Sequence, residues 1–201
     1  MSMTAFDRRV FLKGTAATIP AAAALQLLGG RWAWAQAADF KDDVDVLNFA
    51  LTLEFLEATF YEQANGMNLV TGVESELFQT IEADEKAHVE ALTATIKDLG
   101  GKPVAAPKVD FGGAFNSRES FLKLSHTFEN TGVQAYLGAA GFIKDTAILT
   151  AAASIFGVEA RHAAVVGNLL ELEVEGGVFM GATETPKTKD QVLKAVMPFV
   201  K

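Results

Sequence analysis

Two Glu-x-x-His motifs occur in the chain, and each lies on the apolar face of a long helical pattern. The motifs are EKAH at 85–88 and EARH at 159–162. Residues three apart share one face of an α-helix, and apolar residues at helical spacing flank both motifs. A charged group on a buried face is costly unless it is paired or coordinates a metal. The chain must therefore fold so that several buried helix faces meet around these side chains.

The chain contains four long helical patterns, which cover about 45–65, 74–99, 117–141 and 145–174. Short loops join the first helix to the second and the third to the fourth, which implies antiparallel neighbours. The 17 residues of 100–116 reach roughly 56 Å when extended. A helix as long as the second would measure about 39 Å. The sequence therefore predicts an all-α four-helix bundle with one long crossover between helices two and three.

The first and third helices each supply a Glu followed seven residues later by a Tyr: Glu54 and Tyr61, and Glu129 and Tyr136. Seven residues are two helical turns, so each Glu shares a face with its Tyr. Glu54 precedes Glu85 by 31 residues, and Glu129 precedes Glu159 by 30. This internal repeat predicts two similar helical hairpins whose carboxylates meet at matching depth.

A Glu from each of two helices, together with Glu-x-x-His from each of the other two, resembles the carboxylate-bridged di-metal site of ferritin-like proteins. The resemblance covers roughly residues 45–174 and extends to exported ferritin-like proteins of the desiccation-related type. It implies a ferritin-like bundle with six metal ligands: Glu54, Glu85, His88, Glu129, Glu159 and His162. It further implies that Glu85 and Glu159 bridge or flank two ions and that Glu54 and Glu129 cap the ends.

The charges of the implied ligands favour metal binding. Four carboxylates carry four negative charges, which two divalent ions would balance. Without metal ions, the buried carboxylates repel one another, at a cost of several kcal/mol for each buried charge. Some of them would instead take up protons. Oxygen and imidazole donors without thiolate suit two iron or two manganese ions, and zinc is a further option.

Three more polar side chains stand beside the implied ligands: Glu57, Asp84 and His126. Glu57 is either an additional or supporting ligand or one partner of an interhelical ion pair. Asp84 stands where relatives can place an acid that orients a metal-bound histidine, whereas Val158 occupies the matching position of the fourth helix. His126 either supports the ligands or has a surface or cap-like role.

Tyr61 and Tyr136 are the only tyrosines of the chain. Near a di-metal centre, a buried phenol can hydrogen-bond a ligand or carry an electron, and both residues are therefore candidate catalytic groups. The alternative is that they are core residues whose hydroxyl groups find a partner.

The first 37 residues resemble a twin-arginine export signal. Arg8 and Arg9 precede VFLK, an apolar run covers 14–28, and AWAQA at 33–37 offers cleavage after Ala35 or Ala37. The apolar run is shorter than the roughly 20 residues that span a bilayer. We expect export to the periplasm or cell envelope by the twin-arginine machinery, with no stable membrane span after cleavage. The alternatives are a surface helix and an uncleaved anchor.

The expected domain order is a signal at 1–37, the bundle at 38–175, and a C-terminal loop and short helix at 176–201. The absence of Cys excludes disulfides, thiolate catalysis and iron–sulfur clusters. A net charge of −8 argues against general nucleic-acid binding.

Two functions remain open on these grounds. One is a dinuclear metal protein that reacts with dioxygen or peroxide as a ferroxidase, a peroxidase or a catalase-like enzyme. The other is a stress- or desiccation-related envelope protein whose metal site is mainly structural. Either protein can form a homo-oligomer.

Overall fold

The computed structural model describes residues 40–201, so the expected export signal lies outside the described residues. The chain divides into two units, Met1–Ala37 and Ala38–Lys201, and the helical fold belongs to the second. The described residues form helices and no strand, which confirms the all-α prediction. The helices are α3 (Asp43–Gly66), α4 (Val73–Asp98), η1 (Gly112–Asn116), α5 (Arg118–Ala140), α6 (Thr146–Leu169), α7 (Lys189–Val196) and η2 (Met197–Phe199).

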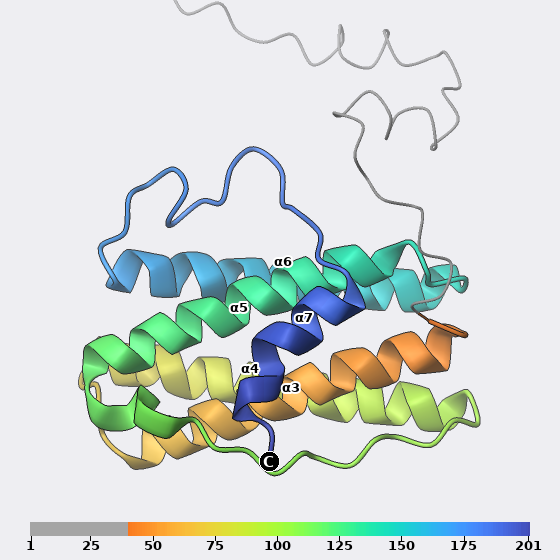
Figure 1. Ribbon diagram of the computed structural model, residues 1–201, viewed down its shortest axis with the longest axis horizontal. Coiled ribbons are helices and arrows are strands. Elements are labelled where there is room, and N and C mark those ends of the chain that lie inside the picture. The colour runs from red at the N-terminus through yellow and green to blue at the C-terminus, as the bar shows by residue number, and fades with distance from the viewer. Residues whose placement is uncertain (1–39) are drawn as a thin grey trace, which may run out of the picture. The chain divides into compact units, whose positions relative to one another are not determined.

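The four long helices form two hairpins, α3 with α4 and α5 with α6 (Figure 1). The segment between α4 and α5 runs the length of the bundle and contains the short helix η1. This arrangement confirms the predicted four-helix bundle with one long crossover. Because α3 and α5 also pack together, the hairpins bring the middle turns of all four helices to one depth.

Local capping fixes where the helices of the second hairpin begin. Ser117 precedes α5 and accepts a hydrogen bond from the amide of Ser120, whose side chain in turn accepts from the Ser117 amide. Asp145 precedes α6 and accepts from the amides of Ala147 and Ile148. Such caps satisfy amides that have no partner within the helix.

Helix α6 ends at Leu169, five residues before the predicted end at Val174. The amide of Leu172 donates to the carbonyl of Gly167, and Glu171 adopts a left-handed conformation with φ of 56°. This is a Schellman ending, in which the left-handed position is usually glycine. The predicted end of this helix was wrong because a Schellman ending is recognised in a sequence by its glycine, and here Glu171 occupies the left-handed position.

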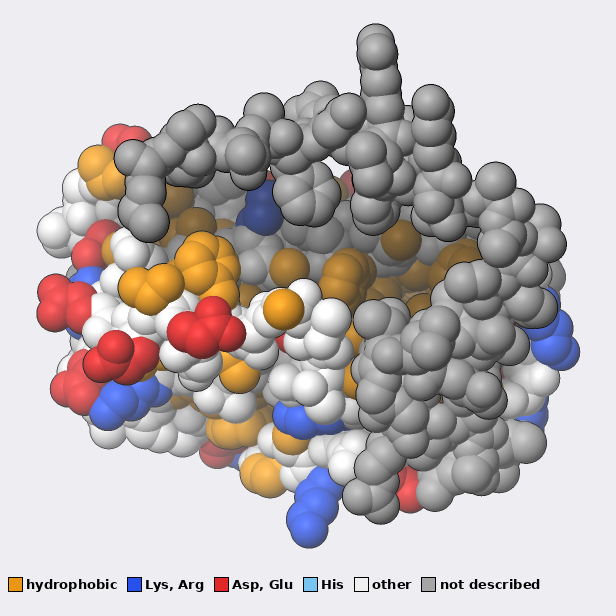
Figure 2. Space-filling model, turned by 90° about the horizontal axis from the view of Figure 1, so that it is seen from above, with side chains coloured by type: hydrophobic (Ala, Val, Ile, Leu, Met, Phe, Trp, Pro, Cys, Tyr) orange, Lys and Arg blue, Asp and Glu red, His pale blue; other side chains and the backbone are white. Residues whose placement is uncertain are grey.

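The residues after α6 form an exposed loop that lies along the upper side of the bundle in Figure 1. Val174 and Phe179 are 66% and 56% exposed, and the exposed Glu171 and Glu173 alternate with apolar residues. Seen from above in Figure 2, hydrophobic and acidic side chains lie next to one another on this side. The loop therefore gives the molecule a mixed apolar and acidic surface.

A cluster of phenylalanines closes one end of the bundle. The ring of Phe60 lies 5.2 to 5.5 Å from those of Phe111, Phe115, Phe121 and Phe128. Helix α7 adds two buried valines to this core, Val192 and Val196. The C-terminal segment thus packs on the bundle through its apolar face, as its amphipathic pattern predicts.

Among the described helices, α6 alone is long and apolar enough to cross a membrane, judged by length and composition. The core helix of a soluble protein passes the same test. The inner face of α6 is buried in the bundle and carries the polar side chains of Glu159 and His162.

Candidate metal centre

The middle turns of the four long helices direct carboxylates and imidazoles into the centre of the bundle. Each of these residues is at most 8% exposed: Glu54, Glu57, Glu85, His88, Glu129, Glu159 and His162. Apolar residues one turn away on the same helix faces, such as Ile81 and Leu92 of α4, are buried as well. The hydrophobic face of each helix therefore carries its polar residues into the core.

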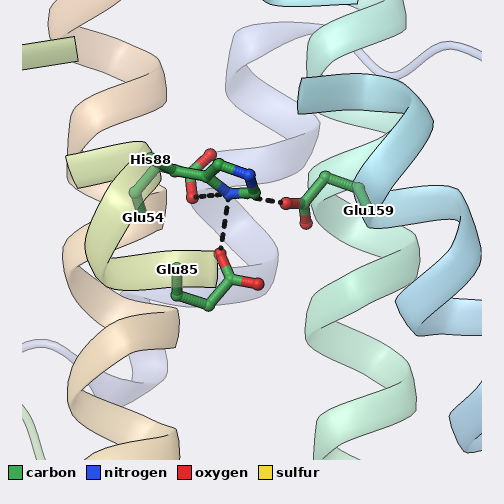
Figure 3. Close-up of side chains that lie close together, drawn as sticks. All are labelled: Glu54, Glu85, His88 and Glu159. Atoms are coloured by element: carbon green, nitrogen blue, oxygen red, sulfur yellow. Dashed lines mark hydrogen bonds and ion pairs between the residues drawn. The ribbon is translucent and has the colours of Figure 1, made fainter. Parts of the chain in front are cut away.

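The first group of ligand atoms surrounds His88 (Figure 3). The Nδ1 atom of His88 lies 3.2 Å from a carboxylate oxygen of each of Glu54, Glu85 and Glu159. The three carboxylates approach the ring from α3, α4 and α6. One ligand atom from each of the four residues lies within 4.8 Å of the others, which is close enough to hold one ion.

The second group surrounds His162 and consists of Glu85, Glu129, Glu159 and His162. The Nδ1 atom of His162 lies 3.0 Å from Oε1 of Glu85 and 3.4 Å from Oε2 of Glu129. Glu85 and Glu159 belong to both groups, the position that a bridging carboxylate requires. Glu54 and Glu129 each belong to one group, at opposite ends.

The two tyrosines bond the carboxylates at those ends. The hydroxyl of Tyr136 on α5 donates to Oε1 of Glu54 on α3, at 2.5 Å. The hydroxyl of Tyr61 on α3 donates to Oε1 of Glu129 on α5. Burial and the adjacent carboxylates raise the pKa of both phenols well above 10, so both remain protonated donors.

One outer contact supports a histidine of the second group. Oδ2 of Asp84 on α4 lies 3.2 Å from Nε2 of His162 on α6. Nε2 is the ring nitrogen that points away from the cluster, so Asp84 can orient the ring while Nδ1 faces the carboxylates.

His126 lies outside both groups. Its Nε2 atom donates a hydrogen bond to the carbonyl oxygen of Gly177, 3.2 Å away, in the loop after α6. His126 therefore ties α5 to that loop.

Glu57 is a fifth carboxylate in the centre, and it belongs to neither group. Among the described residues it has no cationic partner, so they provide no interhelical ion pair for it, and its Oε2 has no hydrogen-bond partner. It faces Gly132, where a Cβ atom would lie 3.4 Å from Oε1 of Glu57 and 2.8 Å from Oε2 of Glu159. The missing side chain of Gly132 makes room for both carboxylates.

The electrostatics of the cluster show a shortage of positive charge. Burial, opposed by a hydrogen bond with His88, raises the pKa of Glu54 to about 8. Burial and the charge of Glu159 raise the pKa of Glu57 well above its usual range. Burial alone would also raise the pKa of Glu85, but hydrogen bonds with both histidines hold it at about 2.

Burial shifts the pKa of the histidines in the direction opposite to that of the carboxylates. Burial by itself lowers their pKa, but hydrogen bonds to the carboxylates raise it to about 12 for His88 and about 11 for His162. Without a metal between them, the carboxylates and imidazoles therefore share protons. Cations that replaced these protons would leave the carboxylates ionised and the imidazoles neutral, as metal ligands must be.

Unpartnered buried atoms test whether this site fits a metal. Nδ1 of His162 lies 3.0 Å from Oε1 of Glu85 and 3.4 Å from Oε2 of Glu129, but these close contacts are not well-aligned hydrogen bonds. The buried polar atoms of the cluster that lack a well-aligned hydrogen bond are Oε1 of Glu85, Oε2 of Glu129, both carboxylate oxygens of Glu159 and Nδ1 of His162. Buried polar atoms without partners are rare and call for an explanation. A cation coordinated by these oxygen and nitrogen atoms supplies one, and the donor set suits iron, manganese or zinc. The cluster is thus compatible with a dinuclear metal site.

Two residues of the site were not identified from the sequence. The Oγ atom of Ser125 lies 2.6 Å from the hydroxyl of Tyr61, and Ser125 is fully buried. Its place in the apolar stripe, one turn before Glu129, is a signal that could have identified it. No sequence signal distinguishes Gly132 from other helical glycines.

Comparisons with known proteins agree with this geometry. Residues 42–172 match the family model described as a ferritin-like domain. A crystal structure of ferritin like, diiron-carboxylate proteins from Bacillus anthracis str. Ames matches with a TM-score of 0.53 and 22% identity. The match covers 63% of this chain and 94% of that chain and shows a shared fold. The search of curated proteins found no match. Since the family model spans more than half of the chain, this protein belongs to the ferritin-like domain family.

Proposed function

We propose that this protein holds two iron or two manganese ions and reacts with dioxygen or peroxide. The observation that carries the proposal is the pair of buried ligand groups that share Glu85 and Glu159. Two such ions, when bound, supply electrons by changing between divalent and trivalent states. Ferrous oxidation, peroxide reduction and catalase-like dismutation are the reactions that such a pair supports.

The protein's own contribution is to position ligands and exclude water. Four helices fix the six ligand side chains, and burial in the core shields them from solvent. The hydroxyl groups of Tyr61 and Tyr136 hold the terminal carboxylates in place. Each phenol contacts a proposed ligand rather than an ion, so both tyrosines are positioning residues in this proposal.

A second function is supported by the position of the site. The two groups join side chains from α3, α4, α5 and α6, so bound ions would link all four helices. An ion that binds only the folded protein stabilises it whether or not it turns over a substrate. A stress- or desiccation-related envelope protein with a structural metal site would use the same residues.

Export by the twin-arginine machinery to the periplasm or cell envelope is part of the proposal. It is supported by Arg8 and Arg9 and by the apolar run that follows them. The twin-arginine resemblance implies export of a folded protein. Folding before export would allow the metal to be chosen in the cytoplasm. This matters because binding affinity alone favours copper and zinc over manganese and iron.

Elemental analysis of the protein from its native compartment, followed by stopped-flow mixing with dioxygen or peroxide, tests the proposal. We expect about two iron or manganese ions per chain and oxidant-dependent turnover. Less than one such ion per chain would exclude the dinuclear site. Two ions without turnover would favour the structural alternative.

The matched variants are Glu85→Ala, which removes a shared ligand, and Glu90→Ala, which changes an exposed residue of the same helix. We expect Glu85→Ala to lose most of the bound metal and the activity. Glu90→Ala should retain both.

A further inference from the structure

We propose that the two metal positions differ, and that the position at His162 binds its ion more tightly than the position at His88. This inference rests on the proposed dinuclear metal site. It concerns which half of the site fills first and which half exchanges its ion more readily.

The internal repeat provides the comparison. Residues of α3 correspond to residues of α5 that are 75 positions later, and residues of α4 to residues of α6 that are 74 positions later. The ligands and tyrosines obey this correspondence: Glu54 with Glu129, Tyr61 with Tyr136, Glu85 with Glu159, and His88 with His162. Residues that break the repeat are therefore candidates for a difference between the two metal positions.

The first break is Asp84, whose counterpart is Val158. Asp84 lies within hydrogen-bond distance of Nε2 of His162. Val158 offers no acceptor, and within residues 40–201 no hydrogen bond reaches Nε2 of His88. The loss of such an outer partner of a metal-bound histidine typically lowers metal affinity by about 10- to 100-fold.

The second break is Ser125, whose counterpart is Ala50. The single proton of the Tyr61 hydroxyl goes to Glu129, so the Ser125 hydroxyl donates to the Tyr61 oxygen. The hydroxyl of Tyr136 bonds Glu54 without such a donor behind it. Linked hydrogen bonds in a buried site strengthen one another, so Tyr61 holds its carboxylate more firmly.

Both breaks favour the same metal position. His162 and Glu129 belong to the second ligand group, so the histidine and the terminal carboxylate of that group are both fixed from outside. In the first group, only Glu54 has an outer partner. Ligands held in place before binding lose less conformational freedom when the ion arrives.

A third break does not distinguish the positions. Glu57 of α3 corresponds to Gly132 of α5, and Glu57 lies opposite Glu159. Because Glu159 belongs to both groups, an effect of Glu57 on Glu159 reaches both metal positions alike. The inference therefore depends on Asp84 and Ser125.

Titration of the metal-free full chain with Mn²⁺ in the absence of oxidants tests the inference. Calorimetry reports the affinities, and electron paramagnetic resonance reports free Mn²⁺. We expect two binding events whose dissociation constants differ by about 10- to 100-fold. His88→Ala should abolish the weak event and retain the tight one, whereas His162→Ala should do the reverse.

Variants of the outer residues test the cause. Asp84→Asn and Ser125→Ala should each weaken the tight event and leave the weak event unchanged. Asp98→Asn, at the exposed end of the same helix as Asp84, is the matched control and should alter neither event. Val158→Asp should strengthen the weak event, and if it does not fold, Asp84→Asn and Ser125→Ala decide.

The possible outcomes separate this inference from the proposed function. Two ions of equal affinity, or a tight event that is lost in His88→Ala, would overturn the inference and leave the dinuclear site intact. Unchanged affinities in both Asp84→Asn and Ser125→Ala would also overturn it. Failure to bind any Mn²⁺ or Fe²⁺ would instead refute the proposed function.

Discussion

Gly132 shows how one residue determines the space in the centre of the bundle. It lies on α5, one turn after Glu129, and faces carboxylates from α3 and α6. In the interior of a helix, glycine costs about 1 kcal/mol relative to alanine. Here that cost is offset because any larger residue would push against Glu159.

We expect Gly132→Ala to lower the free energy of unfolding by about 1 to 3 kcal/mol. It should also weaken metal binding, because the new Cβ atom would lie 2.8 Å from a carboxylate oxygen of Glu159. Gly157→Ala is the matched control, since a Cβ atom on Gly157 of α6 would meet nothing within 4 Å. The free energy of unfolding of this control variant should rise by up to about 1 kcal/mol. Urea unfolding with and without Mn²⁺ measures the stability and the metal binding of both variants. An equal gain in the free energy of unfolding for the two variants would contradict the role of Gly132.

At the scale of elements, the end of α6 determines where the loop leaves the bundle. The Schellman ending at Glu171 turns the chain, and His126 then holds the loop at Gly177. Gly167 allows this approach, because a Cβ atom there would lie 3.1 Å from the Gly177 carbonyl oxygen. The loop is therefore fixed by backbone contacts and by the His126 side chain at the end of the helix that carries Glu159 and His162.

Because φ of Glu171 is 56°, we expect Glu171→Gly to stabilise the protein by up to about 1 kcal/mol. Glycine adopts this left-handed conformation without the steric cost that a Cβ atom brings. Glu173→Gly is the control, because Glu173 does not have a positive φ and should lose stability instead. Thermal unfolding of both variants provides the measurement, and a lower melting temperature for Glu171→Gly would contradict the prediction.

At the scale of the whole molecule, the fold places its least compatible groups at its centre. Five carboxylates and two imidazoles occupy a position that apolar residues would otherwise fill. Removing charges from water is costly, so the arrangement favours stability only when protons or cations balance the charge. The stability of the bundle should therefore depend on pH and on metal.

The free energy of unfolding of the metal-free protein should fall as the pH rises from about 5 to 8. The pKa of Glu54 is raised from 4.5 to about 8, and those of His88 and His162 from 6.5 to about 12 and about 11. A group with a raised folded-state pKa stabilises fully below its unfolded pKa, and this contribution is lost as the pH rises. Glu85, with a pKa of about 2, acts oppositely, but only below pH 4.5.

Urea unfolding in the presence of a chelator, repeated with saturating Mn²⁺, measures this dependence. Bound metal replaces the protons, so the metal-bound protein should be more stable and should not weaken over the same pH range. A metal-free protein that becomes more stable from pH 5 to 8 would contradict the assignment of protons to this cluster.

The sequence by itself determined the four long helices, the crossover and the residues that could bind metal. It could do so because helical periodicity is local and because the repeat of Glu and Glu-x-x-His marks equivalent turns. It failed at the end of α6, where a Schellman ending forms at a Glu rather than a Gly.

Only the tertiary structure decided how these side chains pair. Asp84 could have supported either histidine, and the packing of α4 against α6 brings it to His162. Glu57 could have formed an ion pair, but the gap at Gly132 receives it beside Glu159. Such choices depend on distances between helices that are far apart in sequence, and a helical pattern defines only which face of its own helix a residue occupies.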